Sequence, residues 1–342
     1  MKHRIAYLLL MAAIFSVSLT AAAQPSTYTP AQAFAAAEQN NPEAQQQLSY
    51  IAQDISQSDD DRIKALQQLV RFPGNNALVA IVRALQQDNI PLQLAAIDAA
   101  APYNTSQRWR LLSELLTAEN VSLSNAAAID LLRSWATLTP VQQQQLAPAV
   151  ERYTMQLNSQ TPQAPALIEL ASIYHLQQRW PLSQQHYLSA LVLQPDNASL
   201  YSQLADSYHQ QNDNNTAIEV LQRGLVQLPD NAVLHYNLGL ALLRQQATQP
   251  ALTALAKASQ LEPENAQYWY VYGLALERHD LSHAYQVLEQ SVLLSKQPQI
   301  LFALCDMQVR NHSSQAEQCI DRLALIAPPE AVSLLDEKRR QL

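Results

Sequence analysis

Histidine, cysteine and clustered aspartate side chains are the residues of this chain with the most scope for chemistry. No G-x-S-x-G, phosphate-binding loop, H-E-x-x-H or paired-cysteine zinc spacing occurs in the sequence. His279 and His283 stand four residues apart in HDLSH, a spacing that holds a metal ion when both lie on one helix. We expect a turn between helices at this point and find no clear third ligand, so the interpretation as two solvated imidazoles is favoured over a metal site.

Two other polar groups have a functional and a structural interpretation. His175 and His209 recur 34 residues apart and would line up along a groove, or they are ordinary hydrogen-bonded imidazoles. The run Asp59, Asp60, Asp61 resembles a cation site, but acids at the start of a helix are stabilised by the helix dipole. We predict no metal, no cofactor and no catalytic residue.

Cys305 and Cys319 are the only cysteines of the chain. An exported protein meets an oxidising compartment, where disulfides persist. We expect the two residues on antiparallel helices but about one helical turn apart in depth, whereas a bridge tolerates only about 7 Å between Cα atoms. Two separate thiols are therefore expected slightly ahead of a disulfide, and both interpretations stay open.

A phrase of proline, acid and asparagine recurs along the chain, as LQPDN, QLPDN and LEPEN. Its prolines, Pro195, Pro229 and Pro263, are 34 residues apart. Proline ends a helix, and the asparagine that follows it supplies an acceptor to cap the next helix. The phrase therefore predicts helical hairpins beginning at 164, 198, 232 and 266, with a degenerate fifth hairpin ending near Pro328.

Small and large apolar residues recur at fixed positions of these hairpins, counted from the first residue of each. Positions 7 and 24 are large, and positions 8, 20 and 27 are small, which lets the two helix backbones approach each other. For the first three hairpins these residues are Leu170, Leu204, Leu238; Tyr187, Leu221, Leu255; Ala171, Ala205, Gly239; Ser183, Ala217, Ala251; and Ala190, Gly224, Ala258. The pattern resembles that of tetratricopeptide repeats (TPR), which have a 34-residue period.

The N-terminal half contains helix-length segments without that period. DDDRIKALQQLVRF, NNALVAIVRALQQ and VSLSNAAAIDLLRSWATL are examples, and they resemble degenerate HEAT-like hairpins, with a generic helical domain as the alternative. We predict an all-α fold, an α-solenoid with a HEAT-like N-terminal half and a TPR C-terminal half. The predicted divisions are a signal peptide (1–23), a HEAT-like domain (24–160), about five TPR hairpins (161–330) and a C-terminal capping helix or tail (331–342).

The first residues are typical of a secretory signal peptide. Lys2 and Arg4 precede the apolar run IAYLLLMAAIFSVSL, and TAAAQ offers a cleavage site after Ala23. The alternative is an uncleaved anchor, although the run is short for a membrane span. We predict a periplasmic or secreted protein that is not inserted in the membrane after cleavage.

The charge balance argues against nucleic acid as a partner. Cleavage leaves 19 of the 21 basic residues against 29 acidic ones, a net charge of −10. Phosphate backbones require a basic surface. HEAT-like hairpins followed by TPR also resemble the C-terminal part of exported bacterial multihaem cytochrome-type proteins, but this chain has no CxxCH motif, so only the helical array is implied.

In TPR proteins the first helix of each hairpin lines a concave groove at positions 2, 5, 9, 12 and 13. Here the resemblance implies a partly apolar groove with two arginines at one edge, or else tyrosines that pack on neighbouring helices. The groove residues we predict are Asp206, His209, Tyr236, Leu240, Leu243, Arg244, Tyr270, Leu274, Glu277 and Arg278.

The function we predict is that of a non-catalytic exported scaffold. Its groove would bind a protein or peptide partner and so assist the assembly of an envelope or respiratory, cytochrome-type complex. The alternative is an enzyme or metal-binding protein with a site in the N-terminal helical domain.

Overall fold

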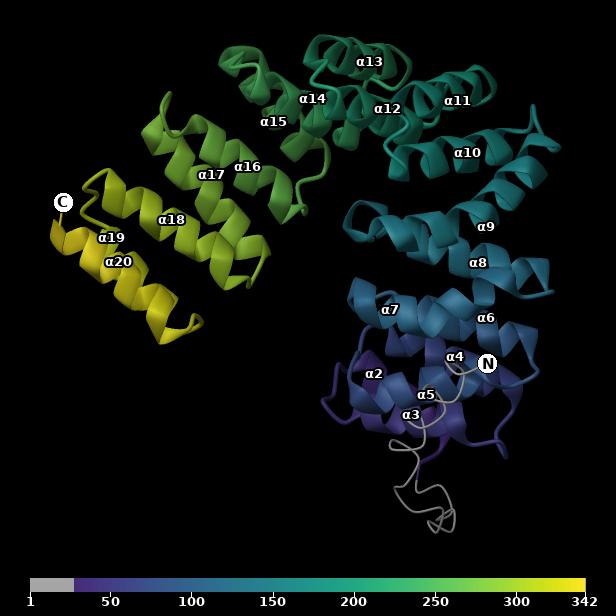
Figure 1. The fold of residues 1–342 in the computed structure, drawn as a ribbon. Coiled ribbons are helices and arrows are strands. Elements are labelled where there is room, and N and C mark those ends of the chain that lie inside the picture. Colours follow the sequence, from purple (N-terminus) through teal and green to yellow (C-terminus); the bar gives the residue numbers. More distant parts are fainter. Residues whose placement is uncertain (1–27, 342) are drawn as a thin grey trace. The chain divides into compact units, whose positions relative to one another are not determined.

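The computed structural model describes residues 28–341, so the predicted signal peptide lies outside the described residues. The described residues form 19 α-helices and two short 3-10 helices, with no strand among them, and the predicted all-α class is confirmed. They divide into two compact units that meet between Met155 and Gln156 (Figure 1). No helix between residues 28 and 341 is long and apolar enough to cross a membrane.

The first unit is a stack of short helices. Its elements are α2 (Pro30–Glu38), α3 (Ala44–Gln53), α4 (Asp59–Leu69), α5 (Asn75–Leu85), α6 (Ile90–Ala99), α7 (Thr105–Leu112), η1 (Ser113–Thr117), α8 (Val121–Leu132), η2 (Trp135–Thr137) and α9 (Pro140–Asn158), which continues into the second unit. Helices pack on the next helix and on the next but one, as α3 does on α4 and α5. Small buried residues such as Ala80 and Ala96 allow this close stacking. The HEAT-like label for this unit stays a prediction.

A buried ion pair joins α7 to α8 in this unit. The guanidinium of Arg108 lies 2.7 Å from the Asp130 carboxylate and also donates to Ser134. Burial raises the pKa of Asp130 above its ordinary value, although the neighbouring arginine opposes the rise. The pair is therefore a structural link, and either side chain alone would be costly to bury.

The second unit is built of helical hairpins that follow one another along the chain. Its helices are α10 (Ala164–Leu176), α11 (Trp180–Leu193), α12 (Ala198–Gln210), α13 (Asn214–Gln227), α14 (Ala232–Arg244), α15 (Thr248–Leu261), α16 (Ala266–Leu276), α17 (Leu281–Leu294), α18 (Pro298–Arg310), α19 (Ala316–Ala324) and α20 (Pro329–Gln341). Each helix from α10 to α19 packs on the next, and α20 packs on both α18 and α19 (Figure 1). Thus α20 takes the place of the first helix of a sixth hairpin.

The recurring proline phrase ends one hairpin and caps the next, as predicted. Helix α11 ends two residues before Pro195, and the same spacing holds at Pro229 and Pro263. The asparagine of each phrase accepts a hydrogen bond from the first turn of the next helix, for example Asn231 from the Leu234 backbone nitrogen. The acid before it makes no such cap.

A second link crosses the same junctions and was not predicted. The ring at position 4 of a hairpin reaches back to the carbonyl of the proline six residues earlier. Tyr201 bonds Pro195 at 2.9 Å, His235 bonds Pro229 at 2.9 Å, and Trp269 bonds Pro263 at 2.8 Å. Each repeat is therefore bonded to the end of the preceding one.

Small residues bring the two helices of a hairpin together. A Cβ added to Gly239 would lie 2.6 Å from Leu255 Cγ, and one added to Gly273 would lie 2.7 Å from Leu288 Cγ. The predicted positions 7, 8, 20, 24 and 27 of the first three hairpins are all buried. The core prediction for these hairpins is confirmed.

The turns inside the hairpins share a left-handed residue. Position 15 has a positive φ in four hairpins, at Gln178 (59°), Asn212 (62°), Gln246 (59°) and His312 (50°). The hairpin of α16 and α17 lacks it because its internal turn is one residue shorter.

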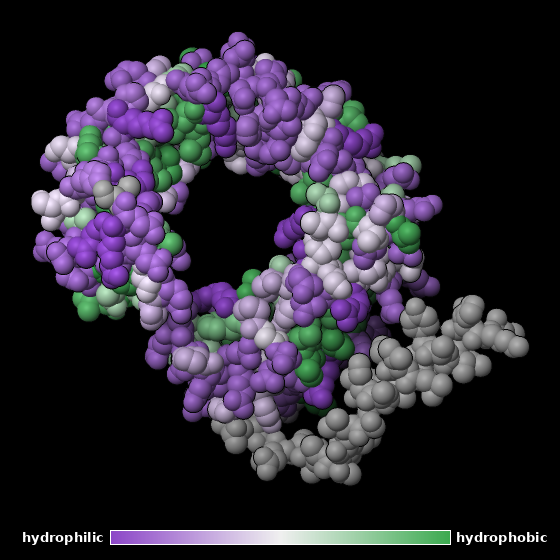
Figure 2. Space-filling model, turned by 60° about the vertical axis from the view of Figure 1, so that its left-hand side comes forward, coloured by the Kyte–Doolittle hydropathy of each residue, from purple (hydrophilic) through white to green (hydrophobic). Residues whose placement is uncertain are grey.

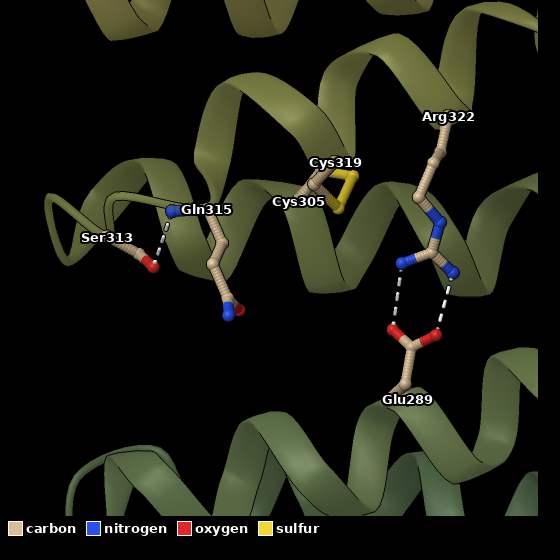
Figure 3. Close-up of a disulfide and its surroundings, with 6 residues drawn as sticks. All are labelled: Glu289, Cys305, Ser313, Gln315, Cys319 and Arg322. Atoms are coloured by element: carbon tan, nitrogen blue, oxygen red, sulfur yellow. Dashed lines mark hydrogen bonds and ion pairs between the residues drawn. A yellow bond between two sulfur atoms is a disulfide. The ribbon is translucent and has the colours of Figure 1, made fainter.

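The two cysteines form a disulfide, which corrects the expectation of separate thiols. Cys305 in α18 and Cys319 in α19 have Cα atoms 5.3 Å apart (Figure 3). The residue midway between them, His312, lies in the turn between the two helices. They are therefore at equal depth in the hairpin, and our offset of one helical turn was wrong.

Candidate functional site

A pocket of about 530 Å³ opens on the second unit, on the first-helix face of its last repeats. One wall is α16, through Tyr270 and Leu274. The second wall is α18, and the third is the turn into α20. The residues of these two walls are Pro298, Gln299, Phe302, Ala303, Asp306, Arg310, Ala327, Pro328 and Ala331. The volume lies in the range of sites that hold a side chain or small ligand.

The lining is mostly apolar because the same helix positions recur. Tyr270 and Phe302 are half-buried and pack against the core below them, so their rings have fixed positions. Leu274 is 36% exposed, which makes it the most accessible apolar side chain of the α16 wall. A fixed aromatic floor with an accessible aliphatic edge is typical of a site that accepts an apolar side chain.

The charged groups at one end of the pocket neutralise one another. Asp306 accepts from Arg310 at 2.8 Å and from Lys338 of α20 at 2.6 Å, and Arg310 also bonds Glu277. Partial burial pushes the pKa of Asp306 upward, but the bonds and charges of Lys338 and Arg310 outweigh it, and its pKa falls below 3.8. These four residues hold α16, α18 and α20 together instead of offering a free charge.

Two arginines remain free at the edge of the same face. Arg244, Arg278 and Arg310 occupy position 13 of three successive hairpins. Arg310 is paired, whereas Arg244 and Arg278 are exposed and form no ion pair with any residue of the described part of the chain. The face therefore offers two unneutralised positive charges beside an apolar pocket.

The predicted groove residues divide into three groups. Tyr270 and Leu274 line the pocket, and Glu277 holds one of its arginines. Tyr236 is half-buried, and its ring lies 4.7 Å from that of Tyr268, with its hydroxyl bonded by Gln267. Leu240 and Leu243 are half-buried beside it, so α14 presents a shallower apolar surface.

The third group is polar. Asp206 of α12 lies 3.3 Å from His175 of α10, whose hydrogen bond lowers the pKa of the aspartate below its ordinary value. His209 bonds the side chain of Asn214 at 2.6 Å. The two histidines therefore have separate structural partners, and the groove face is polar on α10 and α12 and apolar on α16 and α18.

Phe302, Ala327 and Pro328 are pocket residues that the sequence reasoning missed. The predicted groove ended at Arg278, because the fifth hairpin departs from the repeat pattern at Leu304. Continuing positions 5 and 9 of the repeat into α18 would have found Phe302 and Asp306. Nothing in the sequence indicated where α20 lies.

Other candidate sites gather fewer groups. His283 stacks edge-on against Tyr272 at 5.6 Å, while His279 is exposed in the turn that precedes α17. Among residues 28–341 no three His, Cys, Asp or Glu side chains are grouped to hold a metal ion. Figure 2 shows a largely hydrophilic surface with separate hydrophobic patches, and the exposed aliphatic residues include Val192 and Val226.

Repeats packed in sequence, with a groove face formed by their first helices, define the class of tandem helical-repeat proteins. Residues 171–212 and 205–246 match the family model described as TPR repeat. The second unit therefore contains TPR repeats, and the resemblance found in the sequence is confirmed. The resemblance to multihaem cytochrome-type proteins stays a prediction.

Solved structures of similar fold include three TPR or related proteins. YrrB, described as a TPR protein with an unusual peptide-binding site, is 18% identical, with 55% of this chain and 99% of that chain covered and a TM-score of 0.44. The C-terminal part of a TPR repeat-containing protein from Cytophaga hutchinsonii is 13% identical, with 70% and 98% covered and a TM-score of 0.48. PilF of Pseudomonas aeruginosa is 23% identical, with 52% and 86% covered and a TM-score of 0.42. No curated protein matches the sequence.

Proposed function

We propose that the second unit is a protein-binding scaffold that holds a peptide segment of its partner in the pocket between α16, α18 and α20. The observation that carries the proposal is the pocket itself, because three successive first helices contribute apolar side chains to one concavity. TPR repeats form such grooves from these helices, and an extended peptide or a helix can be laid in them. YrrB, a protein of this class, has a peptide-binding site.

The chemistry of the face defines the segment. A large apolar side chain, aromatic or branched, fits between Leu274 and Phe302. Acidic residues beside it would pair with Arg244 and Arg278, which have no other ionic partner in the described chain. A basic segment would meet these arginines unfavourably, which provides selectivity.

We propose further that the scaffold acts outside the cytoplasm, in the assembly of an envelope or respiratory complex. The signal-like residues 1–23 support export, and a buried disulfide is at home in an oxidising compartment. The order of helical hairpins that resembles cytochrome-type proteins supports a cytochrome-type complex as the destination.

A library of random peptides, selected on the immobilised full chain, tests the binding proposal. Enriched peptides should combine one aromatic or branched apolar residue with acidic neighbours. Leu274→Ala removes an accessible contact and should weaken a selected peptide about tenfold or more, as expected for a contact near a hot spot. Arg278→Glu should also weaken it and reduce its salt dependence.

Val226→Ala is the matched control, because Val226 is 76% exposed on the second helix of another hairpin. Its affinity for the selected peptide should equal that of the natural chain. Peptides that bind Leu274→Ala as tightly as the natural chain, or that lose affinity equally in the control, would contradict a site in this pocket.

A further inference from the structure

The disulfide lies between two walls of the pocket. Cys305 precedes the pocket residue Asp306 in α18, the helix that forms the second wall. Cys319 lies in α19, and the turn and helix that follow it supply Ala327 and Ala331 of the third wall. Figure 3 shows the bond as a direct link between these two adjacent helices. The pocket's shape therefore depends on a covalent connection that the predicted peptide site does not itself use.

Few other contacts hold α19 and α20. Helix α19 has nine residues, with no side-chain cap at its start, and its buried residues are Ala316, Cys319, Ile320 and Leu323. Leu335 is the one buried side chain of α20. Its ion pair with α18 is Lys338 to Asp306, and α19 reaches α17 through Arg322, which bonds Glu289 with two nitrogens (Figure 3).

Position in the array adds to this weakness. A repeat inside a solenoid packs on neighbours at both sides, whereas a terminal one packs on one side only. Terminal elements therefore open locally more often than the rest. Both cysteines are buried, with Cys305 at 0% and Cys319 at 3% exposure, so a reductant meets the bond only when this last hairpin opens.

We propose that the Cys305–Cys319 bond is a redox control of the pocket: the oxidised chain holds the pocket closed around its partner, and reduction releases the α19–α20 wall. This inference rests on the proposed peptide-binding function. The reaction is a two-electron exchange with a dithiol. The S–S bond breaks, both cysteines become thiols by gaining the two protons, and the dithiol closes into its own disulfide.

Hydrogen exchange followed by mass spectrometry tests the structural half of the proposal on the full chain. Treatment with dithiothreitol should raise the mass by two hydrogens. A crosslink over a loop of about 15 residues suppresses opening on the order of a hundredfold, so amides of α19 and α20 should exchange up to about a hundredfold faster. Exchange in α12–α15 should be unchanged. Reduced protein with unchanged exchange in α19 and α20 would overturn the inference.

The selected peptide tests the functional half. It should bind the oxidised chain and lose affinity after reduction, and reoxidation should restore binding. Cys305→Ala with Cys319→Ala should bind weakly in both conditions, and unchanged exchange in α12–α15 would show that this variant is folded. A response to dithiothreitol that persists in the alanine variant would overturn the role of the disulfide.

The two proposals fail in different ways. If the oxidised chain selects no peptide, the binding function fails, while hydrogen exchange still reports on the disulfide. If a peptide binds the oxidised and reduced chains equally, the redox inference fails and the binding function stands.

Discussion

At the scale of single residues, the bond between the position-4 ring and the proline carbonyl is the most regular polar contact of the second unit. Three residue types, Tyr201, His235 and Trp269, reach the same acceptor at 2.8–2.9 Å. They share a polar group on the far edge of an aromatic ring. The sequence pattern did not reveal the bond because residue identity changes while the donor position is kept.

Tyr201→Phe removes the donor and keeps the ring. Tyr201 is 3% exposed, so the Pro195 carbonyl would lose a partner that water replaces poorly, and we expect the free energy of unfolding to fall by about 1 kcal/mol. Urea denaturation measures the change. Tyr208→Phe is the control, because no described residue hydrogen-bonds to its hydroxyl. Equal stability of Tyr201→Phe and the natural protein would show that the bond contributes nothing.

The pair of Asp206 and His175 predicts a pH dependence. The hydrogen bond from His175 lowers the pKa of Asp206 in the folded chain below 3.8. A carboxyl with a depressed folded pKa stabilises the fold above its unfolded pKa, and this contribution is lost as the pH falls through the folded pKa. Asp206→Asn should therefore lower the urea midpoint at pH 6, and the difference from the natural chain should disappear below about pH 3.

Asp196→Asn, an exposed position in a turn, is the matched control and should leave the midpoint unchanged at both pH values. A deficit of Asp206→Asn that persists undiminished into strong acid would show that the substitution acts through packing and not through the charge.

At the scale of elements, the turn inside each hairpin carries a steric cost. Gln178, Asn212, Gln246 and His312 adopt the left-handed conformation, in which a side chain crowds the backbone. The short turn of the α16–α17 hairpin avoids this conformation by having one residue fewer. Turn length and backbone conformation are therefore linked in this array.

Gln246→Gly should relieve the crowding. Gln246 is exposed with φ of 59°, so we expect a gain of about 0.5–1 kcal/mol in unfolding free energy, after allowing for the greater freedom of glycine in the unfolded chain. Thermal denaturation would show a raised midpoint. The neighbouring Gln245, with φ of −87°, supplies the opposite case, and Gln245→Gly should lower the midpoint. A lower midpoint for Gln246→Gly would contradict this account.

At the scale of the whole chain, the described residues form two compact units, each with its own core. We expect a fragment of residues 140–342, which keeps α9 intact, to fold by itself, because its hairpins are stabilised mainly by their neighbours. Circular dichroism should show a helical, cooperatively melting fragment. A fragment without helical signal would mean that the second unit depends on the first.

The repeat was predictable from the sequence because its contacts are short in range and recur. Proline, asparagine and small residues such as Ala171 and Ala258 have one physical role wherever they recur, so a single alignment located the cores of the first hairpins. The pocket was less predictable, because Ala327 and Pro328 reach it only through the packing of α20. The disulfide was misjudged because hairpin depth depends on the turn, which the sequence places only within a residue or two.

The disulfide also limits how far the chain can be stretched. Its cysteines are 14 residues apart in sequence, but their Cα atoms stay 5.3 Å apart however hard the two ends are pulled. Full extension of that segment would otherwise add about 45 Å to the length of the unfolded chain. The oxidised protein is thus a shorter tether than the reduced one, and the α18–α19 turn carries no load while the bond is intact.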